Sequence, residues 1–181
     1  MLKPKHSQSG FTVVELLVVI VVIAILAAIS IVSYTGVQSK AYSSKAVSIT
    51  NSYIKLLEMY KTEHGEYPAI DDTPDDVACF GTESNYPARD GMADGVCASD
   101  GRPTSEQLNT ALKVYTGSLP SGELPLVNLT EFDIRFRGVF YERYTPSYVA
   151  IGYALKGGGG KCPIGDTLSA SAATLCYVEL R

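Results

Sequence analysis

The hydrophobic pattern of this chain begins with one long apolar block near the N-terminus. Residues 11–32, FTVVELLVVIVVIAILAAISIV, make 22 positions with a single charge, on Glu15. A helix rises about 1.5 Å per residue, so a helical block of this length spans about 30 Å, the thickness of a bilayer core. The pattern therefore predicts a transmembrane helix over residues 11–35, surrounded either by lipid or by other apolar helices.

The helical pattern continues in more polar form as far as residue 64. Apolar side chains recur at steps of three and four residues, at Tyr34, Val37, Ala41, Ala46, Ile49, Tyr53, Leu56 and Tyr60. One apolar stripe predicts an amphipathic helix half over residues 36–65 that lies on a folded domain. Gly65 and Pro68 predict the end of this helix, with the glycine as a left-handed cap and the proline just beyond it.

The region after this helix changes its pattern twice. Residues 66–103 are dense in Asp, Gly and Pro and show no sustained period, which predicts an irregular loop. Residues 104–116 predict a short helix, with Thr104 and Gln107 forming a capping box in its first turn. A glycine and a proline soon after residue 116 are expected to end it.

The C-terminal part of the chain, residues 130–181, shows the period of two that is typical of strands. Phe132, Ile134 and Phe136 alternate with charged residues in the first run. Such runs occupy residues 132–138, 138–144, 147–155 and 173–180. Short links between them favour an antiparallel sheet of about four strands. We therefore expect an α+β fold, in which the long N-terminal helix packs on this sheet and residues 66–181 form a globular head.

Composition and charge narrow the class of function. The 181 residues have a formal net charge of −4, which argues against a basic protein that binds nucleic acid through its overall charge. The serines form no Gly-x-Ser-x-Gly nucleophile motif, and neither His6 nor His64 has a nucleophile or metal ligand near it in sequence. We expect no catalytic residues and no enzymatic activity.

Four cysteines lie beyond the apolar block, at Cys79, Cys97, Cys162 and Cys176. An even number of cysteines in an exported domain predicts two disulfides, for which three pairings exist. Proximity in sequence favours Cys79 with Cys97 and Cys162 with Cys176. Zinc binding is the alternative, but the spacings lack the close Cys-x-x-Cys pairs of tetrahedral zinc sites.

The residues before the apolar block indicate its orientation and its processing. Lys3 and Lys5, with no acid near them, place the N-terminus on the cytoplasmic side of a single-pass membrane protein, so that the head lies outside. An ordinary secretory signal is cut on the far side of its apolar core. Here the better cleavage site precedes that core, between Gly10 and Phe11, and the absence of a Cβ on the glycine gives a protease close access to the backbone.

Gly10, Phe11, Thr12 and Glu15, in GFTVVELLVVIVVIAILAAI after a short basic leader, carry a family resemblance. The segment resembles the N-terminus of type IV prepilins and of the related pseudopilins of type II secretion. The resemblance implies that a prepilin peptidase removes residues 1–10 and that Phe11 becomes N-methylated. It also implies that a pilus assembly platform and its ATPase build a helical homopolymer with the long helices bundled at its centre.

The resemblance implies a structural function. We expect a subunit of a type IV pilus-like filament, held in the membrane before assembly and exposed as an extracellular fibre afterwards, that supports adhesion, motility or DNA uptake. One alternative is a type II secretion pseudopilin, whose short fibre pushes cargo. Another is a minor pilin in which a DNA- or surface-binding head carries the function.

Glu15 has a physical reason to take part in assembly. An acid near the middle of a membrane costs about 2.5 to 3.5 kcal/mol on insertion scales, so an unpaired carboxylate there calls for a partner. Cleavage after Gly10 creates one, the new ammonium group on Phe11. The pair can form within one helix, where positions four apart face each other, or between an incoming subunit and one already placed. The alternative is a plain signal anchor with Glu15 at the level of the lipid headgroups.

Two groups of charged residues in the head are further candidate sites. Asp90, Asp94 and Asp100 stand among glycines and resemble oxygen-rich calcium loops, which some pseudopilins possess. Their spacing does not follow the EF-hand, and a solvated turn tied by Cys97 is the favoured alternative. No other cofactor is expected. A basic patch for DNA is the second candidate, formed by Arg135, Arg137 and Arg143 because the first two share a strand face.

Overall fold

The computed structural model describes residues 12–157, 160–170 and 173–181, without the side chains of residues 30–36, 169 and 170. The chain divides into two compact units, residues 1–38 and 39–181. The helix α1 is Val13–His64, and the elements after it are η1 (Pro74–Asp76), β1 (Val77–Cys79), η2 (Glu83–Asn85), α2 (Glu106–Lys113), β2 (Glu123–Leu129), β3 (Ile134–Thr145), β4 (Tyr148–Lys156), β5 (Asp166–Ala170) and β6 (Ala173–Leu180).

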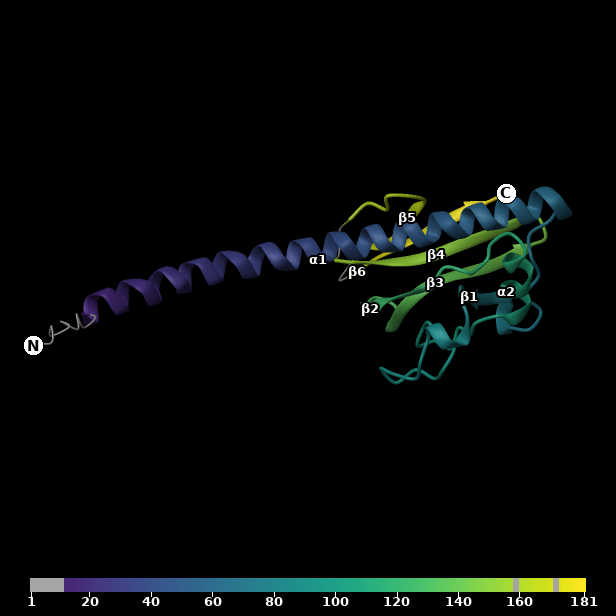
Figure 1. Cartoon of the computed structure of the whole chain (residues 1–181). Coiled ribbons are helices and arrows are strands. Elements are labelled where there is room, and N and C mark those ends of the chain that lie inside the picture. Colours follow the sequence, from purple (N-terminus) through teal and green to yellow (C-terminus); the bar gives the residue numbers. More distant parts are fainter. Residues whose placement is uncertain (1–11, 158–159, 171–172) are drawn as a thin grey trace, which may run out of the picture. The chain divides into compact units, whose positions relative to one another are not determined.

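The second unit is built on a six-stranded sheet in the order β1-β3-β4-β6-β5, with β2 paired to β3 off this path. All of these pairings are antiparallel. The part of α1 that belongs to this unit lies along the sheet (Figure 1). The expected α+β class, a long helix packed on an antiparallel sheet, is confirmed.

The number of strands differs from the expected four for local reasons. The two runs 132–138 and 138–144 form one strand, β3, which continues through Gly138 without a turn. A glycine is needed there because a Cβ would meet the ring and hydroxyl of Tyr86. Strand β1 has only three residues and lies within the segment interpreted as a loop. Strand β2 contains Pro125, which weakens its strand pattern.

The buried stripe of α1 begins later than the sequence pattern suggested. Val37 is 65% exposed and Ala41 is exposed, and the side chain of Tyr34 lies outside the described ones. The α1 residues in the core are Tyr42, Ala46, Ile49, Thr50, Tyr53, Leu56 and Leu57. The prediction was therefore correct from Ala46 onward and wrong for the two positions before it, since the packed row passes through Tyr42.

The predicted end of the helix is confirmed. Gly65 has a φ of +79°, and its amide donates to the carbonyl of Lys61 at 2.8 Å. The left-handed backbone is open to glycine at little cost and closes the last turn. Two residues on, the amide of Tyr67 donates to the carbonyl of Pro146 at 2.8 Å, so the chain leaving α1 is tied to the β3–β4 turn.

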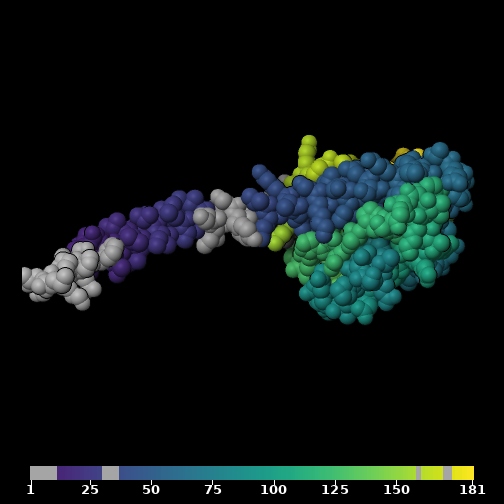
Figure 2. Space-filling view, in the orientation of Figure 1, coloured from purple at the N-terminus to yellow at the C-terminus, as the bar shows by residue number. Residues whose placement is uncertain are grey.

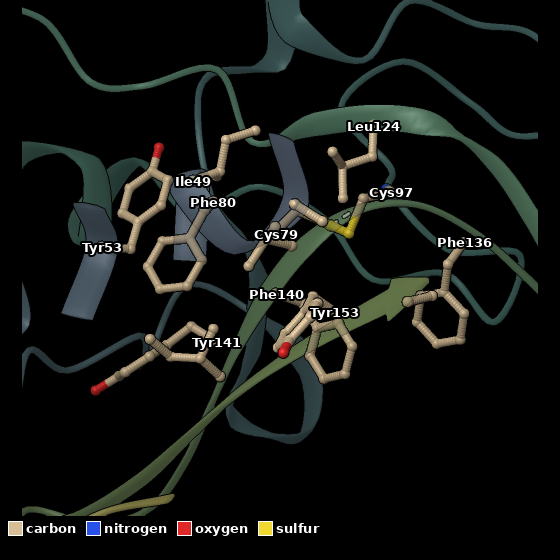
Figure 3. Packing of buried hydrophobic residues seen from close by; sticks show 14 of the residues in the cluster. Ile49, Tyr53, Cys79, Phe80, Cys97, Leu124, Phe136, Phe140, Tyr141 and Tyr153 are labelled. Atoms are coloured by element: carbon tan, nitrogen blue, oxygen red, sulfur yellow. Dashed lines mark hydrogen bonds between the residues drawn. A yellow bond between two sulfur atoms is a disulfide. The ribbon is translucent and has the colours of Figure 1, made fainter. Parts of the chain in front are cut away.

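Aromatic residues fill the core between α1 and the sheet. The rings of Tyr53 and Phe80 stack with centroids 3.9 Å apart, and Phe80 lies 5.8 Å from the ring of Tyr141 (Figure 3). The hydroxyl of Tyr42 donates to the carbonyl of Ala154 on β4 at 3.1 Å. Each of these tyrosine rings buries a large apolar area while its hydroxyl donates to a backbone carbonyl, as a buried tyrosine requires.

The segment between α2 and β2 lies against α1. The hydroxyl of Tyr115 donates to Oε2 of Glu63 at 2.6 Å, and the hydroxyl of Tyr53 donates to the carbonyl of Pro120. In the space-filling view a green region lies along the blue helix (Figure 2). The last turns of α1 are thus held by side chains of the head as well as by the sheet.

The cap of α2 differs from the predicted one. Ser105, one position after Thr104, is the N-cap, and its hydroxyl accepts from the amide of Leu108 at 2.9 Å. The same hydroxyl donates to Asp72 at 2.6 Å, and Asp72 also accepts from the amide of Gln107 at 3.2 Å. A carboxylate from a distant part of the chain therefore replaces the local glutamine of the expected capping box.

Two disulfides tie the second unit together. Cys79 pairs with Cys97 and Cys162 pairs with Cys176, across sequence separations of 18 and 14 residues. These are the pairings that proximity in sequence favoured. Because Cys79 ends β1, its disulfide fixes the long loop between β1 and α2 to the sheet.

Candidate assembly site

The first helical unit presents apolar side chains on every side. Large hydrophobic residues between Val13 and Ile29 are between 47% and 81% exposed in the isolated chain. They surround the helix rather than forming one stripe, and Glu15 is the only charged residue among positions 12–29. A helix that is apolar all round requires apolar surroundings, which are lipid or other helices. Within the described part of the chain, no helix combines the length and the hydropathy needed to cross a membrane.

Thr12 and Glu15 form a reciprocal cap at the start of α1. The amide and the hydroxyl of Thr12 donate to Oε2 of Glu15, at 2.8 and 2.7 Å. In return the amide of Glu15 donates to the hydroxyl of Thr12 at 3.3 Å. This is the Thr-x-x-Glu capping box, in which two otherwise unpaired backbone amides find acceptors.

The role of Thr12 was missed at the sequence level, although its signal is present. A threonine three residues before a glutamate, at the start of an apolar run, is the sequence pattern of such a box. The predicted cleavage and methylation site, Gly10 and Phe11, lies outside the described residues. The pairing of Glu15 with a new ammonium group on Phe11 therefore stays a prediction.

Comparison with known proteins bears on this same segment. Residues 5–31 match the family model of the prokaryotic N-terminal methylation motif. The type II secretion system core protein G of Aeromonas hydrophila is 37% identical over 67 residues, which cover 37% of this chain and 47% of that protein. The N-terminal part of this chain is thus similar to that of type IV pilin and pseudopilin superfamily proteins.

Other relatives match a similar share of the chain. The type II secretion system core protein G of Pectobacterium carotovorum subsp. carotovorum is 38% identical over 66 residues, 36% of this chain and 42% of that protein. The one of Vibrio cholerae serotype O1 is 36% identical over 70 residues, 39% of this chain and 48% of that protein. The chain thus spans about half the length of these relatives. No solved structure matches it.

The three aspartates that the sequence suggested for calcium, Asp90, Asp94 and Asp100, do not gather into one site in the head. Oδ1 of Asp94 accepts from the amide of Ala88 at 2.6 Å. Oδ2 of Asp100 pairs with Nε of Arg102 at 2.9 Å, and Oδ2 of Asp90 lies 3.7 Å from a neighbouring guanidinium. Across the described residues, no three acidic, histidine or cysteine side chains gather as a metal site requires.

The basic patch considered for DNA is corrected by the burial of its central member. Arg137 is fully buried, so it contacts no phosphate on the protein surface. Nη1 of Arg135 donates to the carbonyl of Asp90 at 2.6 Å. Arg143 is a mostly buried side chain, 16% exposed, that lies 3.9 Å from a carboxylate oxygen of Glu66. The first two arginines do share a strand face, but the 86–97 loop covers it.

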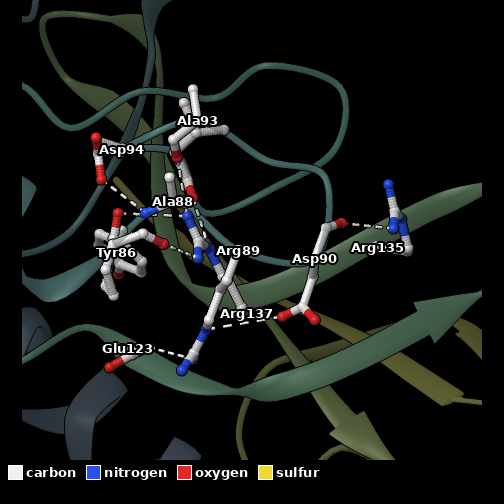
Figure 4. Close-up of polar contacts among 11 residues, drawn as sticks. Tyr86, Ala88, Arg89, Asp90, Ala93, Asp94, Glu123, Arg135 and Arg137 are labelled. Carbon is white, nitrogen blue, oxygen red and sulfur yellow. Dashed lines mark hydrogen bonds and ion pairs between the residues drawn. The ribbon is translucent and has the colours of Figure 1, made fainter.

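Arg137 serves the head in a different way, by holding that loop (Figure 4). Its Nε donates to the carbonyl of Val96 at 2.8 Å, and its Nη1 donates to that of Pro87 at 2.6 Å. Its Nη2 donates to the carbonyls of Ala93 and Tyr86, at 3.0 and 3.4 Å. Burial lowers the pKa of Arg137 from its ordinary value, as does the nearby charge of Arg89, but a guanidinium remains protonated at neutral pH.

Proposed function

We propose that this chain is a structural subunit of a type IV pilus-like filament that assembles through the apolar half of α1. The observation that carries the proposal is the helical stretch 13–29, whose large apolar side chains are exposed all round and accompanied by one charge. Such a surface is soluble only within lipid or within a bundle of like helices. A bundle of identical rods satisfies this requirement in a fibre, and the membrane satisfies it before assembly.

The proposal gives the precursor a single membrane pass with a cytoplasmic N-terminus. Support comes from the methylation motif over residues 5–31 and from the two lysines that precede the apolar block. A prepilin peptidase removes residues 1–10, and the head lies outside the cell, where its disulfides persist. The assembly platform and its ATPase are the further partners, and the proposal assigns no enzymatic reaction to the chain.

Glu15 sets the axial register in this proposal. Its carboxylate lies in the first turn of α1, near the amino terminus that cleavage after Gly10 creates. An ion pair in an apolar layer is strong because little water competes for either charge. When the carboxylate of one subunit meets the amine of the next, only one stagger between the two helices satisfies both charges.

A substitution at each of two positions separates processing from assembly. Glu15→Ala is expected to remain in the membrane and to be cleaved, yet to yield few filaments. Gly10→Val is expected to accumulate as the heavier uncleaved form, because the branched side chain blocks the protease. Mass spectrometry of the membrane fraction and electron microscopy of sheared material measure the two steps. Normal fibres from Glu15→Ala contradict the register argument.

A second candidate function is that of a type II secretion pseudopilin. The observation in its favour is that the similar proteins of three organisms are all named type II secretion system core protein G. Shearing of cells distinguishes the two. A dominant fibre made of this chain supports the pilus subunit, whereas trace amounts favour the secretion device or a minor subunit with a surface-binding head.

A further inference from the structure

The 86–97 loop is organised around a positive charge that belongs to the chain itself. Arg137 projects from β3 into the loop and is fully buried there. Its guanidinium donates to carbonyls of four residues spread along the loop, Tyr86, Pro87, Ala93 and Val96. Both ends and the middle of the loop therefore point their carbonyl oxygens at one centre (Figure 4).

This centre has the chemistry of a cation site. Backbone carbonyl oxygens, turned inward from an irregular loop, are among the ligands that hard metal ions take in proteins. Among the ion pairs of the described residues, none involves Arg137. The carbonyl dipoles, and not a carboxylate, are thus the groups that directly accept its donors. Four converging dipoles stabilise a cation and repel one another when the cation is absent.

A calcium ion does not fit this loop beside the arginine. The space that the carbonyls surround holds the guanidinium, whose planar fork reaches several acceptors at once. The aspartates of the region have other partners: Asp90 pairs with Arg89, Asp94 accepts from the amide of Ala88, and Asp100 pairs with Arg102. The donor set around Arg137 accordingly lacks the carboxylates that give calcium its affinity.

We propose that Arg137 is a built-in cation that takes the place of a bound metal ion in folding the 86–97 loop, so that this part of the head is independent of calcium. The Cys79–Cys97 disulfide fixes one end of the loop covalently. Arg137 gathers the remainder, including the turn that carries Arg89 and its ion pair with Glu123 on β2. This role goes beyond filament formation, because it concerns the head and not the apolar helix.

Trypsin cleavage after Arg89 is a direct measure of loop opening. Arg89 is the only lysine or arginine between Lys61 and Arg102, so cleavage there yields fragments of known mass. The Cys79–Cys97 disulfide holds the two pieces together until reduction, which distinguishes loop cutting from general degradation. When opening is fast relative to cutting, the cleavage rate follows the population of the open loop.

The experiment compares the full chain in a mild detergent with Arg137→Ala and with Arg135→Ala. Arg135 is the matched control, because it lies on the same strand and donates to one loop carbonyl, that of Asp90, from a less buried position. The wild-type rate is expected to be the same with calcium and with a chelator. Arg137→Ala is expected to be cut at Arg89 about tenfold faster or more, since it loses several charge-assisted hydrogen bonds. Arg135→Ala is expected to change this rate far less.

Chemical rescue tests the charge separately from packing. Millimolar guanidinium, far below denaturing concentrations, is expected to slow the cutting of Arg137→Ala, because it restores a planar cation to the cage. Urea has nearly the same shape and no charge, and it is expected to have no such effect. Arg137→Lys, which keeps a cation with fewer donors, is expected to lie between the wild type and the alanine variant.

Three outcomes overturn the proposal. The first is protection of the wild-type loop by calcium together with its opening by a chelator, which assigns the cation role to a metal. The second is equal rescue by urea and guanidinium, which reduces Arg137 to a space-filling group. The third is a wild-type rate in Arg137→Ala. If that variant does not fold, the lysine variant and the calcium response of the wild type still decide.

Discussion

The hydroxyl of Thr12 donates a hydrogen bond of 2.7 Å to Oε2 of Glu15. The amide of Thr12 donates to the same oxygen at 2.8 Å. The carboxylate that we propose sets the filament register therefore also caps its own helix. These bonds restrict the rotamer of Glu15 before any other subunit arrives. A preorganised carboxylate loses less side-chain entropy on pairing than a free one does.

Substitutions at Thr12 test this relationship. Thr12→Val keeps the shape of the side chain but removes its hydroxyl, which is expected to weaken the first turn by about 1 kcal/mol. We expect normal cleavage and a reduced yield of sheared filaments, with a smaller defect than that of Glu15→Ala. Thr12→Ser retains the hydroxyl and is expected to assemble like the wild type. Wild-type yields from Thr12→Val contradict a role of the cap in assembly.

Asp72 makes the head sensitive to acid. Partial burial acts to raise the pKa of Asp72, but hydrogen bonds from Ser105 and from backbone amides of α2 outweigh it and hold the pKa below its ordinary value. A lowered pKa in the folded state means that the stabilisation is complete above the ordinary pKa. It is lost as the pH falls through the lowered one.

The change Asp72→Asn is expected to cost about 1 kcal/mol at neutral pH, since it removes the charged acceptor at the start of α2. The difference from the wild type is expected to shrink at acidic pH, as the pH falls through the lowered pKa of Asp72. Urea unfolding at neutral and at acidic pH measures this effect. Asp71→Asn, at the neighbouring exposed position, is the control, and an equal loss in that variant contradicts the capping role.

Gly152 on β4 lies beneath the ring of Phe140 on β3, its directly paired residue. A Cβ at position 152 would overlap the ring, so Gly152→Ala is expected to destabilise the head by about 1 to 3 kcal/mol, the usual cost of overpacking. Gly117→Ala is the control, because a Cβ there would meet no atom within 4 Å. In calorimetry, the double variant Gly152→Ala with Phe140→Leu is expected to recover part of the lost stability. No recovery argues against the ring as the cause.

The two disulfides are expected to differ in their ease of reduction. Cys79 and Cys97 are both fully buried, whereas Cys162 is partly exposed. A small thiol reagent therefore reaches the Cys162–Cys176 bond first, and differential alkylation with mass spectrometry shows the order. Replacing both Cys162 and Cys176 by serine is expected to lower the free energy of unfolding by about 3 kcal/mol. Earlier labelling of Cys79 contradicts the accessibility argument.

Local patterns were sufficient where a feature depends on neighbours in sequence. The end of α1 followed from a glycine and a nearby proline, because only a local left-handed residue was needed at Gly65. The cap formed by Thr12 and Glu15 has an equally local pattern, Thr-x-x-Glu, which is sufficient to predict it. Strand β1 had no such pattern, since three residues show no period and its pairing partners Phe140, Tyr141 and Glu142 lie far along the chain.

The sequence by itself determined the apolar block with its single acid, the amphipathic helix that follows, and the antiparallel character of the C-terminal part. These features follow from the spacing of apolar and polar side chains along a helix or strand. Only the tertiary structure decided that Asp72 caps α2 and that Arg137 is buried inside a loop instead of facing a phosphate. The physical reason is that an arginine on an exposed strand and an arginine buried among backbone carbonyls have the same sequence pattern. Only the fold brings the carbonyl acceptors, which are distant in sequence, to the guanidinium.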